Sequence, residues 1–384
     1  MKEEAEVVVV GGGVNGTTIA YNLTKREMDV ALFEKDFLSS GATGRSGAGI
    51  RQQFATRENI KLAKRSVEIF EQLSDELDRN LDYRQGGYLI PVHSEEEGKD
   101  FEDRIKLQNE MGVESRWLEL EEVHELVPEL NIENIGAIGA SWCPSDGYID
   151  PFKLTLAYAE NAEDLGAKIY THTKVNDILV HNGEIVGVKT EKGTIKTNTV
   201  VAAAGAWTRD IAAMVGLELP NYPERHEIYV TDKLEHFLDP MIIDFHDNIY
   251  FHQAEAGGIF GGWGGYAPKA PDYNTDTSLK FLKNFSRLLV KYIPKLSEVN
   301  ILRQWAGFYD VTPDAKPILG KTDVKGFIVV CGFSGHGLMI SPATGELITE
   351  LITEGRTSMP DVMEDLSLER FKKGKVEREK GVVG

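Results

Sequence analysis

The sequence predicts two domains, a Rossmann-like α/β domain and an α+β domain whose sheet is mainly antiparallel. Two apolar strands flank a glycine turn and a helix within the first 34 residues. Residues from about 218 to 300 alternate apolar and polar side chains, as the strands of a half-buried sheet do. The length of 384 residues also suits two domains better than one.

The first elements form a βαβ unit. Residues 6–10 are a continuous apolar run, which predicts a buried parallel strand. Residues 14–26 carry apolar side chains at helical spacing, and residues 30–34 predict a second strand. Together they make a unit of about thirty residues, the usual size of one dinucleotide-binding half.

A GxGxxG motif lies between this first strand and the helix. Gly11 permits a tight turn, Gly13 lets the backbone approach a pyrophosphate, and Gly16 allows the helix to pack closely. Glu34 ends the second strand, where its carboxylate can accept hydrogen bonds from ribose hydroxyls. The alternative is a chance glycine turn with a solvated Glu34. The motif predicts dinucleotide binding but does not separate NAD from FAD.

Further strands and helices follow along the chain. Asn-Gly at 182–183 and Lys-Gly at 192–193 indicate hairpin turns. Helices are expected at 58–77, 101–111, 120–126, 152–165, 278–292 and 338–351, and strands at 86–92, 168–173, 175–180, 186–190, 194–196, 199–204, within 250–263 and at 327–330.

The strand at 199–204 is expected to return to the first sheet, so the nucleotide-binding domain is discontinuous. No long flexible linker separates the parts, which indicates closely interleaved domains. The predicted nucleotide-binding domain comprises 1–82, 140–215 and 301–384, and the predicted substrate-binding domain comprises 83–139 and 216–300.

Charge and composition limit the partners. A formal net charge of −19 argues against nucleic acid and against a polybasic membrane attachment. The two cysteines, Cys143 and Cys331, form no CxxC pair, so neither a metal site nor a disulfide framework is expected. No signal peptide or transmembrane segment is predicted, and the cytoplasm is the expected location.

A second glycine turn occurs near the end of the chain. Residues 331–337 read CGFSGHG, follow the strand at 327–330 and lead into the helix expected at 338–351. A helix N-terminus carries partial positive charge, and a reduced flavin is anionic around N1 and the C2 oxygen. This turn therefore favours a flavin over a nicotinamide. His336 within it could contact the flavin or could serve only a structural hydrogen bond.

Five segments carry a resemblance to a known family: GGGVNG with Glu34, SSGATGRSGAGIRQQF, VVAAAGAW, AGFYDVTPDAKPILG and GFSGHGLMISPATGE. Together they span nearly the whole chain and resemble the D-amino-acid-oxidase superfamily of FAD-dependent oxidoreductases. The chain is most similar to the glycine oxidase and sarcosine oxidase β-subunit branch, which includes the β-subunit of dye-linked L-proline dehydrogenases.

The resemblance implies a glutathione-reductase-type FAD domain and a substrate domain that holds a small amino acid over the flavin. Hydride would pass from the carbon next to the amine to flavin N5, and the electrons would pass to a carrier or dye. L-Proline is the first candidate substrate. The alternatives are a sarcosine or glycine oxidase that makes hydrogen peroxide, a non-catalytic electron-relay or assembly subunit, and a 2-hydroxy-acid or glycerol-phosphate dehydrogenase.

The resemblance also assigns site residues. Arg51 is expected to bind the substrate carboxylate, with a surface or interdomain salt bridge as the alternative. Tyr250, Tyr309 and His336 are expected in the catalytic pocket, and the alternative for either tyrosine is a core position. His226 and His252 are weaker candidates. The expected cofactor-binding residues are Gly11, Gly13, Val14, Asn15, Gly16, Glu34, Lys35, Thr43, Gly44, Arg45, Ser46, Gly47, Gly49, Ile50, Val175, Ala204, Gly205, Trp207, Gly307, Gly332, Phe333, Ser334, Gly335, His336, Gly337 and Leu338.

Three positions depart from the patterns of relatives. Gly307 stands where members with covalent flavin have cysteine, so FAD is expected to be noncovalent. Met339 replaces a lysine that binds substrate carboxylate in some relatives. Trp263 lies in a stretch where oxidases have a lysine, and this favours a dehydrogenase. The resemblance further suggests a partner subunit in a hetero-oligomer and leaves open an FMN at a subunit interface.

Overall fold

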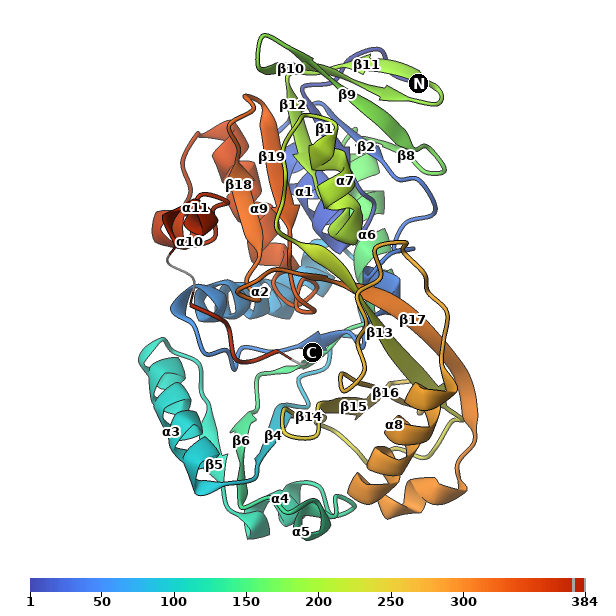
Figure 1. The fold of residues 1–384 in the computed structure, drawn as a ribbon, viewed down its shortest axis with the longest axis vertical. Helices are drawn as coiled ribbons and strands as arrows, with labels where there is room; N and C mark the ends of the chain where they lie inside the picture. The colour runs from blue at the N-terminus through green and yellow to red at the C-terminus, as the bar shows by residue number, and fades with distance from the viewer. Residues whose placement is uncertain (375–376, 383–384) are drawn as a thin grey trace.

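The computed structural model describes residues 1–374 and 377–382 and contains two large sheets, which lie in the upper and lower halves of Figure 1. The upper sheet is parallel except for its edge strand β18. In spatial order its strands are β18 (Ile318–Lys321), β19 (Phe327–Cys331), β12 (Thr199–Ala202), β1 (Val7–Val10), β2 (Val30–Phe33) and β8 (Lys168–Tyr170). The pairing of β12 with β1 confirms the predicted return of the chain to the first sheet.

Both faces of this parallel sheet are covered, which explains its uninterrupted apolar strands. Val7 and Val9 belong to the core on one face, and Val8 and Val10 to the core on the other. One face packs against α1 (Val14–Lys25), α6 (Pro151–Asp164) and α9 (Ser341–Thr353), and α2 (Arg57–Glu76) packs on α9. The other face carries α7 (Thr208–Ala213) and a small antiparallel sheet of β9 (Val175–His181), β10 (Glu184–Thr190) and β11 (Gly193–Lys196).

The lower sheet has eight strands, and only its β14–β4 pair is parallel. In spatial order they are β17 (Ile301–Val311), β13 (Tyr222–Thr231), β16 (Ile259–Trp263), β15 (Ile249–Gln253), β14 (Met241–Asp244), β4 (Tyr88–Val92), β6 (Gly139–Cys143) and β5 (Arg116–Leu118). The remaining elements are β3 (Gly49–Ile50), β7 (Gly147–Tyr148), α3 (Glu95–Glu110), α4 (Leu120–Leu126), α5 (Ile132–Ile135), α8 (Leu279–Tyr292), α10 (Pro360–Asp365), α11 (Arg370–Lys373), and the short 3-10 turns η1 (Thr43–Arg45), η2 (Gly205–Trp207) and η3 (Pro294–Glu298).

Successive side chains along these strands point to opposite sides, so the lower sheet has two different faces. Leu89 and Ile242 belong to the core that the helices α4, α5 and α8 complete. Tyr88 and Met241, one residue earlier on the same strands, point to the opposite face. That opposite face is turned toward the parallel sheet and supplies one wall of the large cavity described below. The predicted architecture, a Rossmann-like domain with a mainly antiparallel second sheet, is confirmed.

Several boundaries differ from those that the sequence predicts. Helix α3 begins at Glu95, not near 101, because Ser94 accepts a hydrogen bond from the amide of Glu97 and caps the helix. Helix α9 begins at Ser341, not at 338. The strands β6 and β17 belong to the eight-stranded sheet, whereas the expected boundaries place residues 140–143 and 301–311 with the nucleotide-binding domain.

A buried polar cluster braces the lower sheet at the ends of β4 and β14. Asp244 is fully buried and accepts hydrogen bonds from His93 Nε2 and Tyr292 Oη, each at 2.6 Å. Burial opposes the charge on His93, but the hydrogen bond and negative charge of Asp244 outweigh it and raise the pKa of the ring. The cluster lies outside the cavity lining and therefore contributes to stability, not to the site.

None of the helices in residues 1–374 and 377–382 is long and apolar enough to cross a bilayer. The same residues contain no group of three His, Cys, Asp or Glu side chains arranged to hold a metal ion.

Candidate active site

One large cavity, of about 530 Å³, lies between the carboxyl ends of the parallel strands and the inner face of the lower sheet. Carboxyl ends of parallel strands are where open α/β sheets bind their ligands. The strands β1, β2, β12 and β19 all end at this cavity, with Val10, Phe33, Ala203 and Val330 in its lining. From the lower sheet, Tyr88, Ile228, Met241, Ile243 and Tyr250 line the opposite wall.

The first glycine turn has the geometry that a nucleotide-binding turn requires. Gly11 adopts a φ of +117°, and a Cβ there would lie 2.4 Å from the carbonyl oxygen of Ala203. A Cβ on Gly16 would lie 1.9 Å from the Gly11 carbonyl oxygen, so the helix packs against the turn only with glycine at 16. Glu34 accepts a hydrogen bond from the amide of Gly12 at 2.7 Å, which fixes its carboxylate beside the turn.

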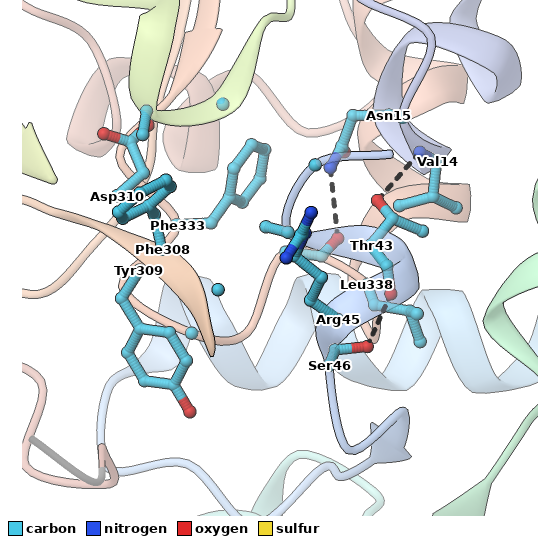
Figure 2. A pocket seen from close by; sticks show the side chains of 18 of the residues that line it. Val14, Asn15, Thr43, Arg45, Ser46, Phe308, Tyr309, Asp310, Phe333 and Leu338 are labelled. Carbon is cyan, nitrogen blue, oxygen red and sulfur yellow. Dashed lines mark hydrogen bonds between the residues drawn. The ribbon is translucent and has the colours of Figure 1, made fainter. Parts of the chain in front are cut away.

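The second glycine turn, residues 331–337, lies beside the first and contacts the start of α1. Asn15, at the start of α1, donates from Nδ2 to the carbonyl oxygen of Gly337 at 3.3 Å (Figure 2). Gly335 has a φ of +94°, and a Cβ on it would lie 2.4 Å from the ring of Tyr309. Residues more than three hundred positions apart therefore share one wall of the cavity.

Asp310 holds the second turn to β17. Its carboxylate accepts hydrogen bonds from the amide of Gly332 and from Asn221 Nδ2, both at 2.5 Å, and its carbonyl accepts one from the amide of Ser334 at 2.8 Å. Burial raises the pKa of Asp310 to about 7. The sequence includes Asp310 within a resembling segment but gives no signal for this bracing role.

The 43–49 loop closes a third side. Thr43 Oγ1 accepts a hydrogen bond from the amide of Val14 at 3.1 Å, and Ser46 donates to the Thr43 carbonyl at 2.8 Å (Figure 2). Arg45 donates from Nη1 to the carbonyl of Ala306 at 2.9 Å, and a Cβ on Gly307 would lie 2.9 Å from Arg45 Cβ. The loop therefore packs tightly against β17, and position 307 has little room for a side chain.

The cavity's own polar atoms fit a bound dinucleotide. Asn15 Oδ1 and both ring nitrogens of His336 are buried and have no hydrogen-bond partner among the described residues. Such atoms are normally paired, so they indicate a ligand. Burial lowers the pKa of His336 to about 4, which keeps its ring neutral at neutral pH and able both to donate and to accept.

Aromatic side chains line the end of the cavity beside Trp207. One of them, Tyr273, comes from the loop between β16 and α8. Tyr273 stacks on Trp207 with ring centroids 4.9 Å apart and donates to Asp210 Oδ2 at 2.7 Å. Lys35 Nζ lies 3.5 Å from the Trp207 ring centre. Flat apolar rings of this kind suit a purine base.

At the other end the cavity carries a buried positive charge. Arg51 is 3% exposed, and its Nη1 donates to the carbonyl of Gln53 at 2.8 Å. Its Nη2 donates to the carbonyl of Gly381, and its Nε has no partner among the described residues. Burial lowers the pKa of Arg51, but a guanidinium stays charged in proteins. An unpaired donor on a buried cation suits a carboxylate ligand.

Tyr250 and Tyr309 also line the end of the cavity that holds Arg51. Burial raises the pKa of Tyr250 well above its ordinary value and that of Tyr309 to about 12, so both stay protonated at neutral pH. A Cβ on Gly47 would lie 2.8 Å from the Tyr250 ring, and the small residue lets Tyr250 reach the loop. His226 stacks on Tyr309 with ring centroids 3.7 Å apart and lines the cavity. His252 lies outside the lining, where burial lowers its pKa to about 4.

The structure brings most expected site residues to this one cavity. Arg51, Tyr250, Tyr309 and His336 all line it. Of the expected cofactor residues, only Gly16, Gly44, Ile50 and Gly332 are absent from the described lining. Lining residues that sequence reasoning missed include Val10, Phe33, Ser40, Tyr88, Asp210, Met214, Met241, Ile243, Tyr273, Phe308, Asp310, Gly381 and Val382.

The parallel sheet with its two glycine turns and the antiparallel sheet over the same cavity have the features of a dinucleotide-binding protein. The family model of FAD-dependent oxidoreductases (DAO) matches residues 6–351, and the chain belongs to that family. The expected membership of the D-amino-acid-oxidase superfamily is confirmed, and the chain is an FAD-dependent enzyme.

The chain is also similar to solved structures and curated proteins whose names are those of amino-acid oxidoreductases. The crystal structure of L-proline dehydrogenase from P. horikoshii is 41% identical, with a TM-score of 0.94 over 98% of this chain and 100% of that one. Glycine oxidase from Geobacillus kaustophilus is 26% identical, with a TM-score of 0.86 over 96% and 99%. Sarcosine oxidase subunit beta from Rhodobacter capsulatus is 29% identical over 97% of this chain and 90% of its own length.

Proposed function

We propose that this protein is an FAD-dependent dehydrogenase of small secondary α-amino acids, with L-proline as the first candidate. The observation that carries the proposal is Arg51, a buried cation with an unpaired Nε at the tyrosine-lined end of the cavity. The 41% identity to an L-proline dehydrogenase supports the choice of proline.

The cofactor is assigned to the glycine-lined part of the cavity. Gly11, Gly13 and the free amides at the start of α1 would hold the pyrophosphate, and the second turn would hold the isoalloxazine edge. We infer that FAD is bound noncovalently, since Gly307 offers no side chain for attachment. An FMN at a subunit interface stays an expectation of the resemblance alone.

When bound, FAD would act as the oxidant and accept a hydride from the carbon next to the amine, and the substrate would be left with a carbon–nitrogen double bond. Arg51 would bind the carboxylate and fix which carbon faces the cofactor. Tyr250 and Tyr309 keep their protons, so they would orient the substrate by hydrogen bonds and would not remove a proton. His336 is a poor base with a pKa of about 4. None of these three side chains is therefore expected to remove a proton from the amine at neutral pH.

One observation favours a dehydrogenase over an oxidase: the lysines in the described lining, Lys35 and Lys174, lie at the end with Trp207, away from Arg51. Trp263 lies outside the lining, so the expectation drawn from it in the sequence carries no weight. The second candidate is a sarcosine or glycine oxidase, because relatives with those names match nearly the whole chain.

The assembly and location are also proposed. A relative that matches 97% of this chain is named as a subunit, which supports a hetero-oligomer with a partner that receives electrons. Cys143 and Cys331 are both free and buried, in keeping with a reducing cytoplasm.

The test is anaerobic reduction of the FAD-loaded protein by L-proline, sarcosine, glycine and glycerol 3-phosphate. We expect loss of the oxidised flavin absorbance with L-proline first, and slow re-oxidation by oxygen compared with a dye. Reduction by glycerol 3-phosphate alone would contradict the amino-acid assignment, and rapid oxygen uptake would favour the oxidase.

A further inference from the structure

Residues 377–382 run back from α11 to the cavity, passing below α2 in Figure 1. The amide of Glu379 donates to the carbonyl of Asp314 at 2.9 Å, which ties the segment to the turn after β17. Gly381 and Val382, two and three residues later, line the cavity. The segment thus connects a structural anchor with the substrate end of the site.

Glu379 is the anchor. Its carboxylate is buried and accepts hydrogen bonds from the amide of Ala55 at 2.9 Å, Thr56 Oγ1 at 2.7 Å, Asn59 Nδ2 at 3.0 Å and the amide of Gly381 at 2.9 Å. Burial opposes its charge, but these hydrogen bonds keep the pKa of Glu379 below its usual value. An ionised carboxylate with this many donors has one orientation, and it fixes the backbone of Gly381.

Gly381 in turn fixes Arg51. The carbonyls of Gln53 and Gly381 accept from the two terminal nitrogens of the guanidinium, while Nε is left without a partner. A guanidinium has five N–H donors, so these two contacts leave donors for a ligand. Arg51 forms no ion pair with any carboxylate in residues 1–374 and 377–382. Its orientation depends on two backbone carbonyls, one of them supplied by the segment that Glu379 holds.

We propose that Glu379 is a positioning residue for substrate binding: it seats the 377–382 segment so that the Gly381 carbonyl orients Arg51 toward the substrate carboxylate. The inference rests on the proposed function, in which Arg51 binds that carboxylate. Glu379 lies outside the described cavity lining, so it acts on ligands through other residues. Its action through Gly381 and Arg51 concerns ligands that carry a carboxylate.

The experiment measures binding of tetrahydro-2-furoate, a cyclic carboxylate without an oxidisable amine, to the FAD-loaded protein by calorimetry. Glu379→Gln keeps the side-chain size but removes the charge and one acceptor. We expect the dissociation constant of tetrahydro-2-furoate to rise by roughly tenfold, the effect of most of one charge-assisted hydrogen bond. The dissociation constant of FAD should stay within about twofold, since Glu379 is outside the cavity lining.

Two further variants separate positioning from general loss of stability. Glu227 is also buried and accepts from Ser278, the cap of α8, but it lies outside the cavity lining. Glu227→Gln and Glu379→Gln should both lower the melting temperature, but Glu227→Gln should leave ligand binding unchanged. A Cβ on Gly381 would lie 3.1 Å from Arg51 Nη1. The same Cβ would lie 3.1 Å from Glu379 Oε1, so Gly381→Ala crowds both partners of this contact and should weaken ligand binding without removing the charge of Glu379.

The outcomes are distinct. If the wild-type protein binds tetrahydro-2-furoate and both Glu379→Gln and Gly381→Ala bind it equally well, the positioning role is wrong while the proposed function stands. Tighter binding by either variant would show that the segment blocks Arg51 instead of orienting it. If the wild-type protein binds no carboxylate and is not reduced by any amino acid, the proposed function itself fails.

Discussion

Replacing Arg51 by glutamine tests the assignment of the substrate carboxylate. Arg51 has an unpaired Nε and spare protons on its terminal nitrogens, so a carboxylate can accept at least two charge-assisted hydrogen bonds. Each such bond contributes roughly 1.5–3 kcal/mol. Losing two of them costs about 3 kcal/mol or more, and the rate of flavin reduction by dilute L-proline should fall by at least about 100-fold.

The assay is anaerobic stopped-flow reduction with L-proline and with pyrrolidine, which has the same ring and no carboxylate. Because pyrrolidine makes no carboxylate contact, Arg51→Gln should change its rate by less than about threefold. Arg104→Gln is the matched control, since Arg104 is mostly buried nearby but bonded to Asp100 and absent from the described lining. Equal losses for both amines would refute the reasoning, because they would indicate a general distortion of the site.

Three further predictions concern the cofactor and stability. A Cβ on Gly16 would collide with the Gly11 carbonyl, so Gly16→Ala should weaken FAD binding by roughly tenfold or more in fluorescence titrations of the apoprotein; unchanged affinity would contradict the packing role. Tyr273→Phe keeps the stack on the indole but loses the bond to Asp210, and FAD release should become about two- to tenfold faster in dilution experiments. The raised pKa of His93 means that its contribution is complete below the usual histidine value of about 6.5 and is lost as pH rises through the folded-state value. His93→Gln should therefore lower the free energy of unfolding more at pH 5.5 than at pH 9 in urea titrations, and an equal loss at both would show that the ion pair is unimportant.

Local signals account for the correct part of the sequence analysis. The positive φ at Gly11 and the close packing at Gly16 depend on residues within a few positions, and the sequence shows them directly. The small hairpin is also local, since Asn182 and Gly183 both adopt positive φ as an Asn-Gly turn requires. Local signals of the same kind predict the second turn at 331–337, and the resemblance supports that prediction.

Long-range packing accounts for what was missed. Tyr88 and Met241 line the cavity only because β4 and β14 pair side by side, and nothing in either segment indicates that pairing. Asp310 and Glu379 act through several hydrogen bonds, most of them with residues distant in the sequence. The sequence shows both as ordinary acidic residues, because nothing near either one indicates that its carboxylate is buried.

A crystal structure of the FAD-loaded protein with tetrahydro-2-furoate would test the cofactor and substrate sites together. We expect an isoalloxazine ring between the 43–49 loop and the turn at 332–338, with the ligand carboxylate in hydrogen-bond contact with Arg51. A flavin elsewhere, or a carboxylate bound away from Arg51 with Gly381 still in place, would contradict this expectation.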